Sequence, residues 1–470
     1  MLNAFVIGYL VLSIAVGLLA SLRVHNSRDF VSAGRSLPLS IVTATMFATW
    51  FGSESVLGAP PTFLQEGIGG IVSDPFGAAF CLIFAGMFFA RALYRRNMLT
   101  IGDFFREKYG REAEVVASTA IMLSYLGWVS AQMIALGVVF SSLSQGAITH
   151  DQGIMIGAAI VIFYTMFGGM WSVAITSFVQ MLVIIVALLI IAWFVSDKAG
   201  GAGVIIEHAR AAGKFEGFWP EWNLAAVLAF VSAFVTLALG SIPQQDVFQR
   251  MNSSKSENIA VAGSILGGVG YLVFCMVPIF LTYAAVVLDP AMVARVIAED
   301  AQQVLPTFIQ NDLPLIMQVL FFGALLSAIM STASGTLLAP STVFTENLLK
   351  PLLKRQTDTQ FLWMLRAVVL VFGVLITLFA VASDASIFEM VENAYKVTLV
   401  AAFVPLTAGI YWRRANRLGA LCSMVGGIGL WLTLEIVAPE AICPPQLAGL
   451  GAAIAGMVLG SLLSRERSPA

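Results

Sequence analysis

Long runs of apolar residues alternate with short polar connections along the whole chain. A helix needs roughly 20 mostly apolar residues to cross the hydrocarbon core of a bilayer, and these runs reach that length. We therefore expect about thirteen membrane-spanning helices, numbered here in chain order. They lie at roughly 2–22, 38–63, 72–94, 113–143, 152–169, 172–196, 222–241, 258–288, 313–349, 361–382, 390–411, 417–437 and 446–464.

Lysine and arginine are distributed unevenly among the connections. With thirteen spans, 20 of the 25 basic residues fall on one side, in or at the edges of the loops after spans 1, 3, 7, 9 and 11 and in the tail. Basic residues concentrate on the cytoplasmic side of membrane proteins. The pattern predicts that the N-terminus is outside and the C-terminus inside, in the plasma (inner) membrane.

Composition excludes the soluble classes of protein. Hydrophobic residues make up 59% and charged residues 11% of the 470 positions, whereas soluble domains have roughly 25% charged residues. A net charge of −2 offers no basic surface for nucleic acid. The four cysteines show no spacing typical of a metal site or a disulfide framework. We therefore expect an all-α integral membrane protein in contact with lipid.

The most informative polar residue is Glu54, deep inside span 2. It lies sixteen residues beyond Pro38, about 24 Å along a helix that rises 1.5 Å per residue. Gly52 and Ser53 weaken the helix just before it, and two prolines at 60–61 disrupt it again. An ionisable residue at this depth indicates a functional site, and non-helical backbone survives there only beside a cavity or packed in protein. The alternative is a kinked helix whose glutamate bonds a neighbouring hydroxyl.

Span 9 carries small hydroxylated residues at high density over 327–336. Such residues allow helices to pack closely, which is one interpretation. The other is that the adjacent hydroxyls of Ser331 and Thr332 supply hard oxygen ligands for a small cation such as sodium. No charged ligand is needed if several oxygens converge.

Two residues of span 4, Trp128 and Gln132, are four positions apart and share one helical face, where they line a pocket or simply pack. Trp50 and Glu54 in a cavity would suit an ammonium group, through cation–π contact and charge pairing. An amino acid, an amine or another nitrogenous compound fits this chemistry, and a sugar fits it less well.

Four stretches resemble motifs of the sodium/solute symporter family, which contains proline, sugar, choline and sialic-acid carriers. Residues 57–60 are similar to the family's L-G-x-P, and 328–332 are very like the proline-carrier version of span 9. Residues 164–180 resemble its Y-T-x-x-G-G…T-D-x-x-Q. The inner loop after span 7, at 249–256, is similar to its Q-R-x-x-x-x-K-S. The likeness covers essentially the whole chain.

The resemblance implies a LeuT-type fold, in which two inverted repeats of five helices form the core. The repeats would be 38–196 and 222–411, in a single transporter domain that spans 1–470. An extra helix at 2–22 precedes them, and two further helices at 417–464 follow them.

The same resemblance implies a sodium site shared by spans 2 and 9. Its ligands would be the carbonyls of Ala48, Phe51 and Ala328 and the hydroxyls of Ser331 and Thr332. One departure from the family pattern concerns the number of ions. Where the family motif has Thr-Asp, this chain has Ser177 after its threonine, so we expect one sodium ion per transport cycle.

The predicted function is therefore a sodium-coupled symporter that imports a small polar solute, and not an enzyme. One alternative is a transporter-like receptor that signals through a partner; another is a carrier coupled to protons through Glu54. The residues expected to line the solute site are Thr49, Trp50, Gly52, Ser53, Glu54, Trp128 and Gln132.

Overall fold

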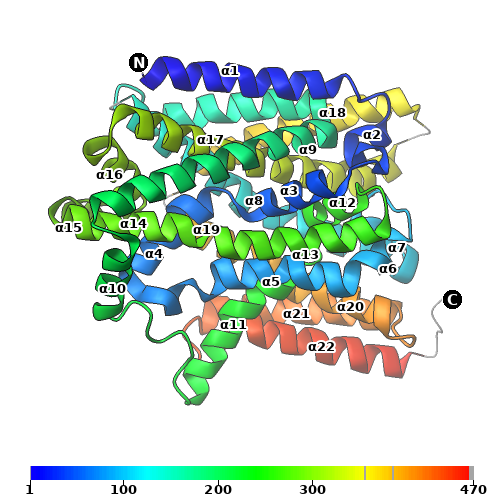
Figure 1. Cartoon of the computed structure of the whole chain (residues 1–470). Coiled ribbons are helices and arrows are strands. Elements are labelled where there is room, and N and C mark those ends of the chain that lie inside the picture. The colour runs from blue at the N-terminus through cyan, green and yellow to red at the C-terminus, as the bar shows by residue number, and fades with distance from the viewer. Residues whose placement is uncertain (1, 145, 354–355, 384–385, 465–470) are drawn as a thin grey trace.

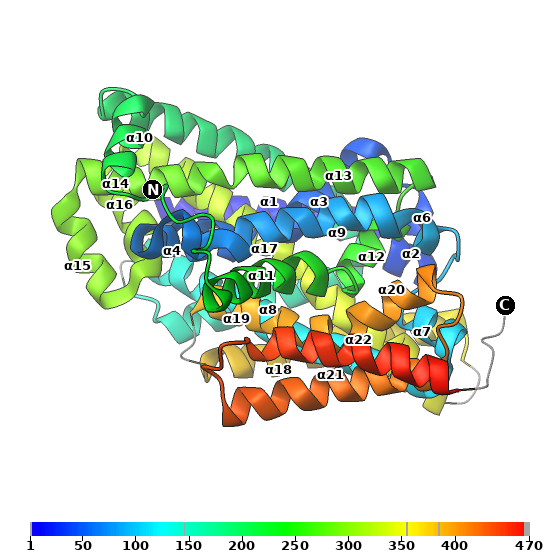
Figure 2. The same ribbon diagram turned by 90° about the horizontal axis from the view of Figure 1, so that it is seen from below.

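The computed structural model describes residues 2–144, 146–353, 356–383 and 386–464. Its long helices lie side by side along a common axis and form a single bundle (Figures 1 and 2). The start of α1 (Leu2–Ser21) and the end of α22 (Pro445–Leu463) lie at opposite ends of this bundle (Figure 1). That arrangement agrees with an odd number of passages along the bundle.

The first half of the chain forms the N-terminal helix and the helices up to α10, with short π- and 3-10-helical turns between them. Their bounds are α2 (Ser27–Ser32), η1 (Ala33–Arg35), α3 (Leu39–Trp50), η2 (Glu54–Gly58), α4 (Ala59–Glu66), η3 (Gly67–Ile71), η4 (Val72–Gly77), α5 (Ala78–Phe84), η5 (Ala85–Phe89), α6 (Ala90–Tyr94), α7 (Ile101–Tyr109), α8 (Arg111–Leu143), α9 (His150–Lys198) and α10 (Ala202–Ala211).

The second half runs from α11 to the paired helices α21 and α22. The bounds are α11 (Leu224–Gly240), α12 (Gln245–Asn252), α13 (Glu257–Phe274), α14 (Met276–Leu288), α15 (Pro290–Asp300), η6 (Ala301–Gln303), α16 (Val304–Asp312), α17 (Leu315–Val343), η7 (Phe344–Leu349), η8 (Lys350–Leu352), α18 (Asp358–Val381), α19 (Ile387–Thr398), η9 (Leu399–Phe403), α20 (Val404–Tyr411) and α21 (Arg417–Val437).

Polar residues at the span boundaries fix where several helices begin. Asn223, Ser256 and Asn416 precede α11, α13 and α21, and the side chain of each accepts a hydrogen bond from a backbone N–H of the first turn. A side-chain oxygen at this position satisfies a donor that the helix itself leaves unpaired. The apolar runs therefore start as helices close to the predicted boundaries.

Within the described residues, nine helical stretches are long and apolar enough to cross a membrane, and the bent pair α11 and α12 makes ten. One of the nine is α9, whose 49 residues are bent at Gly169 (φ 51°, ψ −145°). A straight helix of that length would measure about 74 Å, more than twice the ~30 Å core of a bilayer. We therefore count α9 as two passages that divide at the glycine pair predicted to separate spans 5 and 6.

Burial separates inner helices from peripheral ones. Every residue of α17 from Phe321 to Val343 is buried, whereas most of the apolar stretches of α18 and α21 lie on the outside. Large apolar side chains on these outer faces, such as Trp363 and Val425, are exposed. Such outward apolar faces suit lipid, and the polar residues gather inside the bundle.

One stretch predicted as an inner loop is a buried helix. The motif at 249–256 begins within α12, which follows α11 after a bend of 44°, and all eight residues of α12 are buried. Because α12 is rich in polar residues, its hydrophobic pattern does not distinguish it from a loop. Two chain breaks therefore lie inside the bundle, one after α3 and one after α11.

Candidate functional site

The site is built around the interruption between α3 and η2. The helix ends at Trp50, and Phe51 leaves the helical region (φ −78°, ψ 76°). Helical structure resumes as a π-helical turn at Glu54. The interruption lies where glycine and serine weaken the predicted span, and non-helical backbone at this depth needs protein packed around it.

Gly52 is the point where three side chains from different helices meet. A Cβ at this position would lie 2.7 Å from Thr332 Oγ1, 2.8 Å from Glu54 Oε2 and 2.9 Å from Gln132 Oε1. Thr332 comes from α17 and Gln132 from α8. The absence of a side chain at Gly52 thus lets the hydroxyl expected to bind sodium approach the carboxyl expected to bind solute.

The carboxyl group of Glu54 is completely buried and is held by neutral donors. Gln132 Nε2 donates to Oε2 at 2.8 Å, and Trp128 Nε1 donates to Oε1 at 3.3 Å. The Gln132 amide oxygen in turn accepts the backbone N–H of Ser53 at 3.0 Å, so the amide links the carboxyl to the broken backbone. No basic side chain among the described residues forms an ion pair with Glu54. A buried carboxylate in such surroundings suits a cation supplied from outside the protein.

Aromatic rings form a second part of the site, directly beside Glu54. Trp50 stacks on Trp128 with ring centroids 5.1 Å apart, and Tyr395 contacts them at 5.1 and 5.4 Å. Tyr125 also stacks on Trp128, with ring centroids 5.9 Å apart. The indole N–H of Trp50 is buried and finds no hydrogen-bond acceptor within the described part of the chain. Aromatic faces beside a carboxylate are the surroundings that organic ammonium groups prefer.

The residues expected to bind sodium lie at the crossing of α3 and α17. Thr332 Oγ1 donates to the Ala48 carbonyl at 3.1 Å, which joins the two spans directly. Ser331 Oγ and Ser177 Oγ are hydrogen-bonded at 2.7 Å, so the position where the family motif has aspartate adjoins this crossing. Phe51 and Ala328 are also buried nearby on α3's end and on α17. These neutral oxygens have the hard character that sodium requires.

Thr49 is placed differently from the other expected solute-site residues. Its hydroxyl donates to the Thr45 carbonyl at 3.0 Å, within its own helix. This back-bonding satisfies the hydroxyl locally, whereas Trp128 and Gln132 of α8 both donate to Glu54 on another helix.

A second buried carboxylate, Asp74, escaped the sequence analysis. Tyr271 donates to its Oδ1, and Tyr271 also shares a 3.1 Å hydrogen bond with Ser55, whose hydroxyl donates to the Trp50 carbonyl at 2.9 Å. Asp74 Oδ2 is buried without a partner among the described residues. The signal was available, because Asp74 lies within the predicted span 72–94, as Glu54 lies within span 2.

The buried helix α12 contributes an ion pair that is joined to the aromatic rings through Tyr125. Arg250 Nη1 lies 3.1 Å from Asp246 Oδ2, and Tyr125 donates its hydroxyl to the other oxygen of Asp246. Arg250 had been assigned to an inner loop, so its burial is a correction. The pair links α12 to α8, where Tyr125 also stacks on Trp128.

Comparison with known proteins identifies the family of this chain. A family model described as the sodium:solute symporter family matches residues 30–427. The chain belongs to the sodium:solute symporter family. Membership makes it a transporter and not an enzyme, and a multi-pass membrane protein.

Several relatives of this symporter have named solutes. It is 27% identical over 447 residues to the high affinity choline transporter 1 of Homo sapiens, covering 92% of this chain and 76% of that protein. It is 24% identical over 488 residues to the osmoregulated proline transporter OpuE of Bacillus subtilis (strain 168), covering 97% and 94%. The high-affinity proline transporter PutP of the same strain is 25% identical over 469 residues, covering 97% and 96%.

Solved structures establish the fold of this symporter. A Na+-coupled sialic acid symporter in a substrate-bound outward-open state matches it with a TM-score of 0.82 at 19% identity, covering 100% of this chain and 98% of that one. The nucleobase-cation-symport-1 family transporter Mhp1 matches with a TM-score of 0.62 at 16% identity, covering 93% and 95%. The symporter therefore has the LeuT-type fold.

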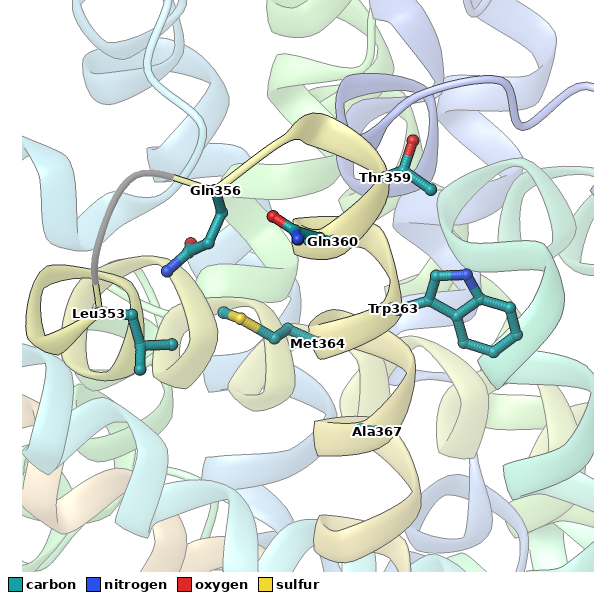
Figure 3. A pocket seen from close by; sticks show the side chains of 7 residues that line it. All are labelled: Leu353, Gln356, Thr359, Gln360, Trp363, Met364 and Ala367. Atoms are coloured by element: carbon teal, nitrogen blue, oxygen red, sulfur yellow. The ribbon is translucent and has the colours of Figure 1, made fainter.

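A wide, open hollow on the outside of the symporter is unrelated to this site. It follows α18, with Leu353, Gln356 and Met364 on one side and Trp363 on the other (Figure 3). None of its lining residues belongs to the break in α3 or contacts Glu54. The buried carboxyl, hydroxyl and aromatic groups of the candidate site lie inside the bundle instead.

Proposed function

We propose that this symporter couples sodium entry to the import of a small polar solute that carries an ammonium group. The observation that carries the proposal is the Glu54 carboxyl, buried among neutral donors beside the rings of Trp50, Trp128 and Tyr395. A cation bound there would gain both charge pairing and cation–π contact. The relatives named for choline and proline support the choice, since both of these solutes contain a positively charged nitrogen.

The proposed sodium ligands are the carbonyls of Ala48, Phe51 and Ala328 and the hydroxyls of Ser331 and Thr332. The contact between Thr332 and the Ala48 carbonyl supports this set because it brings α3 and α17 together at the right place. Thr332 also reaches the same Gly52 that contacts Glu54. Sodium bound at the crossing would fix the broken backbone beside the solute, and so couple the two binding events.

The proposed topology has thirteen passages, with the N-terminus outside and the C-terminus inside. The repeats 38–196 and 222–411 would form the moving core, flanked by 2–22 and 417–464. The two breaks support this division, because α3–η2 and α11–α12 open the corresponding first helices of the two repeats. Alternating access would then proceed by movement of one part of the core against the other.

The proposal is tested on purified full-length protein in two assays. A thermal-shift screen of amines, quaternary ammonium compounds, amino acids and sugars should reveal stabilisation by an ammonium compound that is stronger with sodium than with potassium. The same compound should accumulate in proteoliposomes when an inward sodium gradient is imposed.

The outcomes separate the alternatives. Binding without any flux would indicate a receptor. Accumulation driven by a proton gradient, with no need for sodium, would indicate proton coupling through Glu54. Stabilisation by sugars alone would contradict the ammonium assignment.

A further inference from the structure

A cavity of about 240 Å³ lies between α4, η6 and the start of α19. α4 and α15, the helix that leads into η6, are at the end of the bundle where α1 begins (Figure 1). In the proposed topology this end faces the outside. The cavity is smaller than the roughly 300–1,000 Å³ of pockets for drug-sized ligands, so it suits a small solute.

The lining of this cavity combines a carboxylate with an aromatic ring. Asp300 is the one charged residue among the described residues that line it, and Phe388 contributes the ring. Asp300 Oδ1 accepts hydrogen bonds from the backbone and the side chain of Gln302, at 3.0 and 3.4 Å. Gln302 in turn accepts the backbone N–H of Ile387 at 3.4 Å, which attaches this turn to α19.

The cavity borders the helical turn that carries Glu54. Gly58 lines the cavity, and a Cβ on Gly58 would lie 3.7 Å from Glu54 Cβ. The same Cβ would lie 3.7 Å from both Cβ and N of Phe388. Gly58, the last residue of the turn that carries Glu54, therefore lines the cavity together with Phe388.

We propose that the cavity is an outer subsite that holds the cationic solute before it reaches Glu54. Asp300 supplies the charge, and the face of Phe388 supplies cation–π contact, so the outer subsite repeats the chemistry of the inner one. A negative charge at the entrance also raises the local concentration of a cation and speeds its arrival. The proposal rests on the proposed function in one respect, namely that the solute is a cation.

Two aspartates that cap helices provide a matched pair of variants. Asp300→Asn removes the charge and keeps a side chain that can still accept the hydrogen bond from Gln302 N, since asparagine caps as well as aspartate. Asp289→Asn makes the same change at the start of α15, where Asp289 accepts from Met292 N at 3.0 Å and does not line the cavity. Any effect on folding should therefore be similar in the two variants.

The probe is tetraethylammonium, whose binding to the full-length protein in sodium is measured by calorimetry. An exposed charge contact contributes up to about 1 kcal/mol, so Asp300→Asn should weaken binding by about fivefold. Binding to Asp289→Asn should match the wild type. Uptake of the solute by Asp300→Asn should show a raised KM with an unchanged maximal rate.

Two results would overturn the outer subsite: no binding of the probe to the wild type, or equal binding by the Asp300→Asn and Asp289→Asn variants. If the transported solute is instead neutral, the proposed function fails while the tetraethylammonium assay still decides the subsite. The two failures are therefore distinguishable.

Discussion

At the scale of single residues, two buried carboxylates, Glu54 and Asp74, are linked through hydrogen-bonded side chains to the backbone at the break after α3. Glu54 stood out because it interrupts an apolar run beside glycine and serine, and its bonds to Gln132 and Trp128 join residues named beforehand. Asp74 carries the same signal but lies near the predicted start of its span, where a polar residue is easily taken for part of the loop. Its link to Tyr271 and Ser55 depends on tertiary contacts that no local pattern contains.

The first prediction concerns the charge of Glu54. Glu54→Gln keeps the shape of the side chain and its place beside Gln132 but removes the charge, so the affinity for the solute should fall by roughly 2–5 kcal/mol. Sodium binding without solute should change much less, because the proposed sodium ligands are neutral oxygens. Titrations of solute and sodium at two pH values measure both.

Each other result of that titration has a definite meaning. Loss of pH dependence with intact solute binding would assign Glu54 to a proton. A variant that unfolds more easily but transports normally would assign it a structural role. Unchanged affinity for both ligands would remove Glu54 from the site.

At the scale of helices, the sequence revealed the first chain break and missed the second. The break after α3 is indicated by Gly52 and Ser53, which interrupt an apolar run. The break after α11 is followed by α12, which contains the buried ion pair of Asp246 and Arg250. Its polar sequence resembles a loop, because a hydrophobicity pattern cannot show that two polar side chains pair with each other inside the protein.

The second prediction tests the crossing of α3 and α17. Replacing Ser331 and Thr332 with alanine removes two proposed sodium oxygens, so the sodium concentration for half-maximal uptake should rise at least several-fold while expression persists. The matched control is Ser341→Ala with Thr342→Ala, an adjacent pair on the same helix whose hydroxyls donate to carbonyls one turn earlier. Wild-type sodium dependence in the first double variant would show that the site is misplaced.

The third prediction tests how tightly α12 fits against α17. A Cβ on Gly335 would lie 2.3 Å from Arg250 Nη2, and this guanidinium is buried and tied to Asp246. Gly335→Ala should therefore lower the free energy of unfolding by about 1–3 kcal/mol, as overpacking does. Gly323→Ala on the same helix meets nothing within 4 Å and should leave the melting temperature equal or slightly higher. Equal melting temperatures of the two variants would contradict this packing.

At the scale of the whole molecule, hydrophobic runs alone predicted an all-helical membrane protein, and the LeuT-type fold followed from the resemblance of short motifs. The proposed internal repeat could not be read from the residues, because two repeats can share a fold without sharing side chains. The described chain ends lie at opposite ends of the bundle (Figure 1), whereas the thirteen passages and their orientation stay predictions.

The fourth prediction concerns the number of ions moved in each cycle. Ser177 offers a hydroxyl where the family motif has a carboxylate, so the α3–α17 crossing should hold one sodium ion and uptake should depend on sodium with a Hill coefficient near one. Simultaneous measurement of charge and solute flux in proteoliposomes gives the ratio directly. A ratio of two sodium ions per solute would refute the inference from Ser177.

The hydroxyls at the α3–α17 crossing have a consequence for the step in which the empty carrier returns to its starting conformation. Ser331 pairs with Ser177, and Thr332 pairs with the Ala48 carbonyl. These groups can thus satisfy one another after the ion has departed, and no uncompensated charge is left in the protein interior. A carboxylate in place of Ser177 would have to keep an unpaired charge during the conformational change, or first bind a proton. In the proposed cycle the serine would let the unloaded carrier reset without that electrostatic barrier, which would favour fast turnover over a steeper concentration ratio.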